Sequence, residues 1–205
     1  MSTTAPIVYV VDDDVSFLAA TSRLLRASGF AVKTFASVSE FLAQRDVNAA
    51  GCVVADLQMP GLNGLDLQTA LGRTSNPLPI VFLTGHGDIP TSVRAMRGGA
   101  EDFLTKTVPK TALLHAIRRA LARDAREREE RARRREVCAR FEKLTERERE
   151  VLRHVVRGRL NKQIAGDLGI CERTVKAHRS SITRKLRAPS VAELTRLAHE
   201  TGDLP

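Results

Sequence analysis

Four short apolar runs in the first half of the sequence each end in a side chain that can handle a phosphoryl group. In order, the runs are followed by Asp12, Asp13 and Asp14, by Asp56, by Thr84 and by Lys106. A carboxylate can attack phosphorus and form an acyl phosphate, while a hydroxyl and an ammonium can stabilise the phosphoryl oxygens. Carboxylates are also preferred ligands of Mg²⁺ beside phosphate. These residue types therefore indicate magnesium-dependent phosphoryl chemistry, provided that the fold brings them together.

The runs lie in an alternating pattern of β-branched strands and amphipathic helices, which is typical of a parallel α/β sheet. We expect strands at 7–11, 31–35, 52–55, 80–84 and 102–106, and helices near 15–28, 38–44, 65–73 and 90–98, with a fifth helix starting near Pro109. The predicted fold is a flavodoxin-like five-stranded parallel sheet in the order 2-1-3-4-5. Ligands bind outside the carboxyl ends of such strands, so the four polar groups should meet in one pocket.

Charge separates the two halves of the chain. The net charge is −1 over residues 1–117, +5 over residues 118–149 and +5 over residues 150–205. The basic half predicts a polyanionic partner such as nucleic acid. The three cysteines lie far apart, which favours neither a disulfide framework nor a zinc site and fits the reducing cytoplasm. The absence of a signal-like start and of a run of about 18 apolar residues argues against secretion and against membrane spanning. A membrane surface is a weaker alternative than nucleic acid for the basic half, and no membrane partner is expected.

The second half is predicted to be entirely helical. A capping box formed by Thr145 and Glu148 opens the first helix of this region. Three more helices are expected at about 161–168, 172–187 and from Pro189 to Leu197, and Gly169 lies in a tight turn between the first two of them. Two helices joined by a short glycine-containing turn form the DNA-binding helix-turn-helix arrangement. We therefore predict that a small all-α domain follows the α/β domain and that it binds DNA.

We expect three segments: a phosphoacceptor domain at 1–122, a charged helical linker at 123–143 and a helix-turn-helix domain at 144–205. Arg, Glu and Ala dominate the linker from Arg123 to Arg135, with opposite charges spaced i, i+4. This composition is typical of a solvated helix. A coiled coil is disfavoured because no heptad repeat of apolar residues persists.

The helix expected at 172–187 has an apolar face and a polar face. Val175, Ile182 and Leu186 fall on one side at 100° per residue. The opposite side carries Arg173, Lys176, Ala177, Ser180, Arg184 and Arg187. Small and basic residues suit the major groove, where phosphates attract cations and base edges require close approach.

The first domain resembles the receiver domain of bacterial two-component response regulators, in particular the FixJ-like group. The resemblance rests on the motifs Val10-Val11-Asp12-Asp13-Asp14, Asp56-Leu57-Gln58-Met59-Pro60-Gly61 with Gly64, Leu83-Thr84-Gly85-His86-Gly87-Asp88 and Asp102-Phe103-Leu104-Thr105-Lys106. It implies that Asp56 accepts phosphate from a sensor histidine kinase. It also implies that Mg²⁺ is bound by Asp12, Asp13, Asp56 and the backbone carbonyl of Gln58, that Lys106 pairs with the phosphate, and that Thr84 and Phe103 form the switch.

The second domain resembles the LuxR-type helix-turn-helix. The motifs are Leu144-Thr145-Glu146-Arg147-Glu148, Asn161-Lys162-Gln163-Ile164-Ala165, Leu168-Gly169-Ile170 and Thr174-Val175-Lys176-Ala177-His178-Arg179. The resemblance implies base-facing positions at Lys176, Ala177 and Ser180 and phosphate contacts from Lys162, Arg184 and Lys185, and Arg173 belongs to the same exposed set. Cys171 stands where this family often has Ser or Ala, and a thiol is a poor helix cap.

Together the resemblances predict a phosphorylation-dependent transcriptional regulator of the FixJ/NarL type rather than an enzyme. Its only expected catalysis is magnesium-dependent self-phosphorylation and dephosphorylation of the receiver aspartate. The expected partners are a histidine kinase, double-stranded promoter DNA and a second copy after phosphorylation, with RNA polymerase as a further candidate. One departure concerns Thr107, which follows Lys106 where the family usually has a cis proline. A cis bond before threonine would cost about 2.5 to 4 kcal/mol, so we expect a trans or strained loop here.

Two other classes of protein remain as alternatives. The run Asp12-Asp13-Asp14-Val15 also resembles the nucleophile motif of magnesium-dependent haloacid-dehalogenase-like phosphohydrolases. That hypothesis leaves Asp56 without a role and lacks an acidic pair after Lys106. A constitutive DNA-binding protein with a relic acidic pocket is the second alternative.

Overall fold

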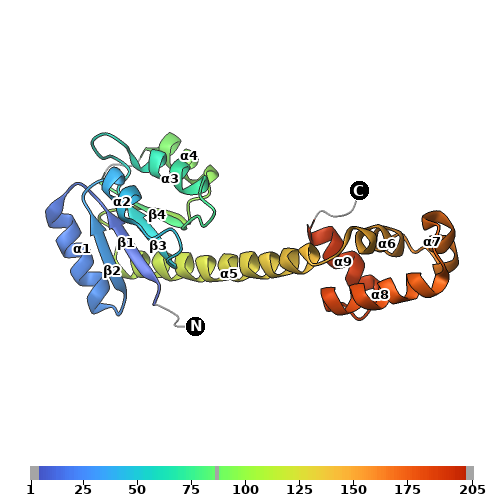
Figure 1. Cartoon of the computed structure of the whole chain (residues 1–205). Coiled ribbons are helices and arrows are strands. Elements are labelled where there is room, and N and C mark those ends of the chain that lie inside the picture. Colours follow the sequence, from blue (N-terminus) through green and yellow to red (C-terminus); the bar gives the residue numbers. More distant parts are fainter. Residues whose placement is uncertain (1–4, 86–87, 202–205) are drawn as a thin grey trace. The chain divides into compact units, whose positions relative to one another are not determined.

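The computed structural model describes residues 5–85 and 88–201, so His86 and Gly87 of the receiver-like motif lie outside the described residues. The chain divides into two compact units, Met1–Arg128 and Glu129–Pro205. Figure 1 labels their elements. No helix among the described residues is both long and apolar enough to cross a membrane.

The first unit is the predicted doubly wound α/β fold (Figure 1). Its strands are β1 (Ile7–Val11), β2 (Ala31–Phe35), β3 (Gly51–Ala55), β4 (Ile80–Thr84) and β5 (Asp102–Thr105). Its helices are α1 (Val15–Ala27), α2 (Val38–Gln44), α3 (Gly64–Gly72), α4 (Ile89–Arg97) and the start of α5 (Lys110–Glu142). All strand pairs are parallel and the order is β2-β1-β3-β4-β5, which confirms the predicted sheet.

Two apolar layers hold the sheet between its helices. Val8 and Val10 of β1 face a cluster formed with α1 and α5, while Tyr9 and Val11 face a cluster formed with α2, α3 and α4. Every residue of β3 and β4 is buried, including the predicted strand residue Cys52. Burial on both faces explains why these strands read as continuous apolar runs rather than as alternating ones.

Local capping positions the loop that follows β1. The Asp14 side chain accepts hydrogen bonds from the backbone N–H groups of Ser16 and Phe17 and so starts α1 directly after the acidic run. At the start of α2, the Ser37 side chain accepts a hydrogen bond from the Glu40 N–H, and the Glu40 carboxylate accepts one from the Ala36 N–H. These two bonds fix the start of α2 after β2.

The second unit contains α6 (Glu146–Val156), α7 (Asn161–Leu168), α8 (Glu172–Leu186) and α9 (Val191–Thr201) (Figure 1). Both hydrogen bonds of the predicted capping box between Thr145 and Glu148 are present. Gly169 ends α7 with φ of 63°, a left-handed conformation that glycine adopts without strain. The resulting tight turn leads into α8, and the two helices form the predicted helix-turn-helix.

The predicted linker is helical, and a few of its side chains are buried. The helix α5 is 33 residues long and continues without a break through the predicted linker. Asp124 is only 1% exposed, and Val137 and Phe141 belong to the apolar core of the second unit. The predicted helix is therefore confirmed and most side chains at 123–135 are exposed or partly exposed, but the buried Asp124 was not predicted, because a charged sequence pattern reports local helix formation and says nothing of partners distant in sequence. The functional division at residues 122 and 143 stays a prediction.

Candidate functional site

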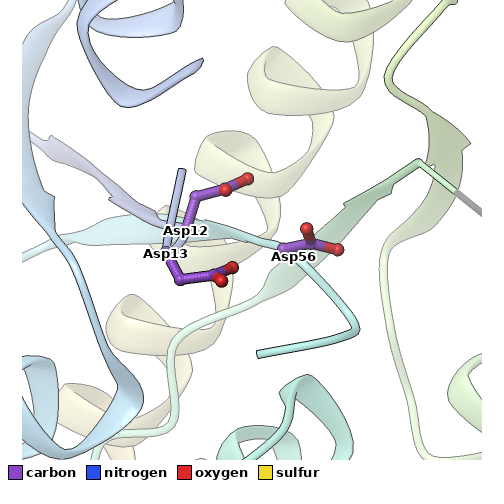
Figure 2. A group of neighbouring side chains, drawn as sticks. All are labelled: Asp12, Asp13 and Asp56. Atoms are coloured by element: carbon purple, nitrogen blue, oxygen red, sulfur yellow. The ribbon is translucent and has the colours of Figure 1, made fainter. Parts of the chain in front are cut away.

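Three carboxylates meet at the carboxyl end of the sheet. Val11 and Ala55 are paired in register, so Asp12 and Asp56 follow adjacent strand ends, and the Asp56 N–H donates to the Val11 carbonyl at 2.9 Å. Asp12, Asp13 and Asp56 each offer an oxygen within 4.8 Å of the others. Figure 2 shows the three side chains at the ends of β1 and β3. The convergence predicted from the strand ends is therefore present.

The acidic cluster is partly removed from solvent. Asp12 is 1% exposed and Asp56 is 8% exposed, whereas Asp13 is exposed. Burial raises the pKa of Asp12, although its hydrogen bonds to Lys106 and to the Asp14 N–H act in the opposite direction. Buried carboxylates at this spacing require a cation.

Lys106 supplies one such cation. Its Nζ lies 2.7 Å from Asp12 Oδ2 and 2.7 Å from Asp56 Oδ2. Burial acts to lower the pKa of Lys106, but hydrogen bonds to the two carboxylates raise it above its ordinary value. The ammonium also lies 4.3 Å from the centre of the Phe17 ring, a cation–π contact that sequence reasoning missed because no local pattern links α1 to β5. Lys106 is thus a fixed positive charge in the pocket.

The backbone holds Lys106 in place without a proline. The Lys106 N–H donates to the Thr84 carbonyl at 2.8 Å, and the peptide bond to Thr107 is trans. The hydroxyls of Thr105 and Thr107 lie 3.0 Å apart and are hydrogen-bonded. A trans loop therefore allows Lys106 to reach both carboxylates.

The remaining predicted residues of this pocket lie on neighbouring elements. Thr84 is buried at the end of β4. Phe103 is partly buried on β5, and its ring centroid lies 6.1 Å from that of Phe82. Gln58 is exposed in the loop after β3, and its N–H donates to Asp56 Oδ1 at 3.3 Å. Thr84 and Gln58 thus lie at this edge of the sheet, whereas Phe103 lies inside β5, opposite Phe82 of β4.

A second candidate surface is the outer face of α8. Val175, Ile182 and Leu186 are buried, as predicted from the helical period. The expected DNA-contacting side chains Arg173, Lys176, Ala177, Ser180 and Arg184, together with Lys162 on α7, are exposed. The exposed face is therefore small and basic, which suits approach to a DNA groove.

Lys185 differs from the other expected phosphate contacts. Its Nζ lies 2.6 Å from Oε2 of Glu148, a side chain that is buried at the start of α6. The same oxygen accepts the Thr145 N–H at 2.7 Å. The ammonium of Lys185 therefore belongs to an internal ion pair, and we leave it out of the proposed DNA contacts. In the sequence, the capping box indicated only the role of Glu148 at the start of α6 and not its ion pair with Lys185.

Cys171 caps α8 poorly, as predicted. Its side chain accepts no hydrogen bond from the backbone of the helix. Instead its Sγ lies 3.1 Å from the Thr174 hydroxyl, which lowers the pKa of the exposed thiol.

A phosphoacceptor-like pocket on a doubly wound sheet and a basic helix-turn-helix define a signal-controlled DNA-binding protein. Residues 8–118 match the family model of the response regulator receiver domain, and residues 142–198 match that of the bacterial regulatory proteins of the luxR family. The chain belongs to the two-component response regulators and is a transcriptional regulator with a receiver domain and a LuxR-type DNA-binding domain.

Full-length relatives share this organisation. The response regulator protein TodT of Pseudomonas putida is 42% identical over 203 residues, which cover 99% of this chain and 89% of TodT. The transcriptional regulatory protein FixJ of Azorhizobium caulinodans is 40% identical over 97% of this chain and 94% of FixJ. The structure of the response regulator StyR shares 46% identity with a TM-score of 0.86 and covers 96% of this chain and 100% of StyR. These matches favour the regulator over the phosphohydrolase and the constitutive DNA-binding protein.

Proposed function

We propose that Asp56 accepts a phosphoryl group from a sensor histidine kinase and that this event controls promoter binding by α8. The observation that supports the proposal is the convergence of Asp12, Asp13 and Asp56, with the ammonium of Lys106 in contact with Asp12 and Asp56. Asp56 is the candidate nucleophile because it follows the central strand β3 and lies beside Asp12, Asp13 and the ammonium of Lys106.

The side chains present fit a divalent cation. Carboxylates of Asp12, Asp13 and Asp56 with the backbone carbonyl of Gln58 form an all-oxygen donor set of the kind that Mg²⁺ prefers. Two of the carboxylates are buried, and one ammonium cannot balance three negative charges. Mg²⁺ would supply charge neutralisation for the transferring phosphoryl oxygens.

The chain's own residues account for the transfer step. An Asp56 carboxylate oxygen attacks phosphorus, the O–P bond forms, and the P–N bond to the kinase histidine breaks with its electron pair leaving on the imidazole. Asp56 then carries an uncharged acyl linkage, so the ammonium of Lys106 exchanges a carboxylate partner for the new phosphoryl oxygens. Hydrolysis of the acyl phosphate returns Asp56 to its starting form and gives the receiver its self-dephosphorylation.

We assign the switch to Thr84 and Phe103, which lie on the strands beyond β3. The buried Thr84 hydroxyl can donate to a phosphoryl oxygen, and Phe103 on the adjacent β5 can follow its movement. The surface formed by α4 and β5 would then favour a homodimer. Two copies of α8 would occupy two half-sites about 34 Å apart along promoter DNA.

In the second unit, the proposed DNA contacts are the exposed side chains Lys162, Arg173, Lys176, Ala177, Ser180 and Arg184. Lys176, Ala177 and Ser180 would face bases, and the others would contact phosphates. This role places the protein in the cytoplasm with the promoter, and RNA polymerase is a candidate partner there.

Labelling with acetyl phosphate and Mg²⁺ tests the proposed phosphoacceptor. Asp56→Asn should abolish labelling, whereas Asp88→Asn, a matched change at an exposed helix cap, should leave it intact because asparagine also caps helices. Unchanged labelling of the Asp56 variant would refute the assignment.

Operator binding tests the DNA surface. Lys176→Ala should weaken binding by about 1 to 3 kcal/mol if the side chain contacts a base, or lower the salt slope by about 1 if it contacts phosphate alone. Binding equal to wild type at every salt concentration would exclude both roles.

A further inference from the structure

Helix α5 carries a buried aspartate beyond the stretch that matches the receiver domain model. Asp124 is 1% exposed, and its Oδ2 accepts hydrogen bonds from the Gly51 N–H at 2.9 Å and from Arg128 Nε at 2.7 Å. Arg128 also donates Nη1 to the Asn48 carbonyl at 2.9 Å and Nη2 to the Ala49 carbonyl. One turn of α5 therefore holds the loop and strand start at residues 48–51 with three hydrogen bonds, and a fourth joins Asp124 to Arg128 within the helix.

These contacts occupy the end of β3 opposite to the phosphorylation pocket. Gly51 is the first residue of β3, and Asp56 follows its last residue, Ala55. A Cβ on Gly51 would lie 2.0 Å from the Ile7 carbonyl oxygen, so this strand start is packed closely against β1. The strand is thus attached at one end to the candidate phosphoacceptor and at the other end to α5.

The attachment of α5 to β3 is strong, but not every buried polar atom in it has a hydrogen-bond partner. The Oδ1 atom of Asp124 is buried and accepts no hydrogen bond from the residues described here. Arg128 is the ion partner of the Asp124 carboxylate, with 21% exposure of its side chain. In the low-dielectric interior a further loss of hydrogen bonds from this carboxylate would be costly, so a shift of β3 would also shift α5. Hydrogen-bond networks between rigid elements of this kind can carry coupling between distant sites.

We propose that Asp124 and Arg128 form a clamp that transmits the state of Asp56 along β3 into α5. The inference rests on the proposed function, because it assumes that phosphorylation at Asp56 alters DNA binding. Asp124 is a positioning residue: it touches neither the phosphoryl group nor DNA. It makes the part of α5 beyond Arg128 respond to the position of β3.

Two clamp variants and two matched controls test the proposal in the full chain. Asp124→Ala removes the acceptor of Gly51, and Arg128→Ala removes the donors to residues 48 and 49. The controls are Glu130→Ala and Arg126→Ala, which alter exposed side chains of the same charges on the same helix. Near-ultraviolet dichroism of Tyr9, the single tyrosine of a chain without tryptophan, checks the fold of the first unit. Arg128→Ala keeps the test available if Asp124→Ala fails to fold.

The readout is the ratio of operator affinities with and without beryllofluoride, measured on a DNA site selected by the wild-type protein from a random pool. Coupling between sites commonly changes affinity by about 5- to 150-fold. We expect both clamp variants to lose most of the wild-type ratio while acetyl phosphate still labels Asp56 at the wild-type rate, and both controls to keep the ratio.

The outcomes separate the two proposals. A wild-type ratio of one would contradict the proposed function itself. A full ratio in folded Asp124→Ala and Arg128→Ala proteins would overturn the clamp while leaving the proposed function intact. Loss of labelling in either clamp variant would also overturn it, because the residues would then act on the pocket rather than on transmission.

Discussion

Replacing Glu148 by glutamine should destabilise the second unit by about 3 kcal/mol at neutral pH. The Glu148 carboxylate is buried at the start of α6 and lies 2.6 Å from the Lys185 ammonium on α8. Glutamine can still accept the Thr145 N–H, so the capping box survives the substitution. The change therefore removes the charge of Glu148 while the shape of the side chain is retained.

The magnitude follows from the pKa of Glu148. Burial alone would raise this pKa, but the Lys185 ammonium and the donors at the helix start lower it from 4.5 to about 2. Each unit of pKa difference corresponds to about 1.4 kcal/mol, so the charged form gains on the order of 3 kcal/mol in the folded state. An exposed pair such as Arg147 with Glu150 contributes at most about 1 kcal/mol.

The pKa of Glu148 is lower in the folded state than in the unfolded state, and this order fixes the sign of the pH dependence of stability. The stability contributed by Glu148 is fully present above about pH 4.5 and is lost as the pH falls towards 2. The Glu148→Gln protein lacks this contribution at every pH. The stability difference between wild type and variant should therefore shrink across this window and vanish near pH 2.

Hydrogen exchange of the α6 and α8 amides, corrected for intrinsic rates at each pH, measures the difference in the second unit alone. Tyrosine emission cannot do so, because Tyr9 lies in the first unit and the chain has no tryptophan. Glu150→Gln is the control, with a half-exposed acid on the same helix. Equal protection in the two variants, or a Glu148→Gln difference that keeps its neutral-pH size at pH 2, would refute the reasoning.

Two further substitutions test local packing. Gly64→Ala should slow labelling of Asp56 and destabilise the first unit by about 1 to 3 kcal/mol, because a Cβ there would lie 2.5 Å from the Asp56 carbonyl oxygen. At the other end of α3, a Cβ on Gly72 would meet no atom within 4 Å. Gly72→Ala should therefore leave both the labelling rate and the stability in urea unfolding unchanged. Cys171→Ser should stabilise α8 by about 1 kcal/mol by supplying a capping oxygen, seen as a higher thermal midpoint. An unchanged thermal midpoint would contradict the inference that Cys171 caps α8 poorly.

The sheet and its pocket were predictable because their signals are local or follow from topology. Continuous apolar runs mark strands buried on both faces, and the polar residue after each run lies at the carboxyl edge in any parallel sheet. The meeting of Asp12 and Asp56 follows from the pairing of β1 with β3. The buried face of α8 was likewise predicted from its period, since Val175 and Ile182 are two turns apart.

The contacts that sequence reasoning missed join residues far apart in sequence. Asp124 lies 73 positions from Gly51, and Glu148 lies 37 positions from Lys185. In both cases the local pattern was already explained, by i, i+4 charge pairs in α5 and by the capping box in α6. A charged residue with a sufficient local role gives no sign that its side chain is also buried against a distant partner.

The continuity of α5 restricts how the length of this protein can change. Asp124 must face β3 while Val137, 13 residues later, must face the apolar core of the second unit. Each set of contacts fixes which face of its own part of α5 is buried, because neighbouring residues lie about 100° apart around the helix axis. An insertion or deletion within either set would turn buried side chains of that set towards solvent. Chimeras that exchange receivers or DNA-binding domains should therefore be joined between residues 128 and 137, where neither set of contacts is interrupted.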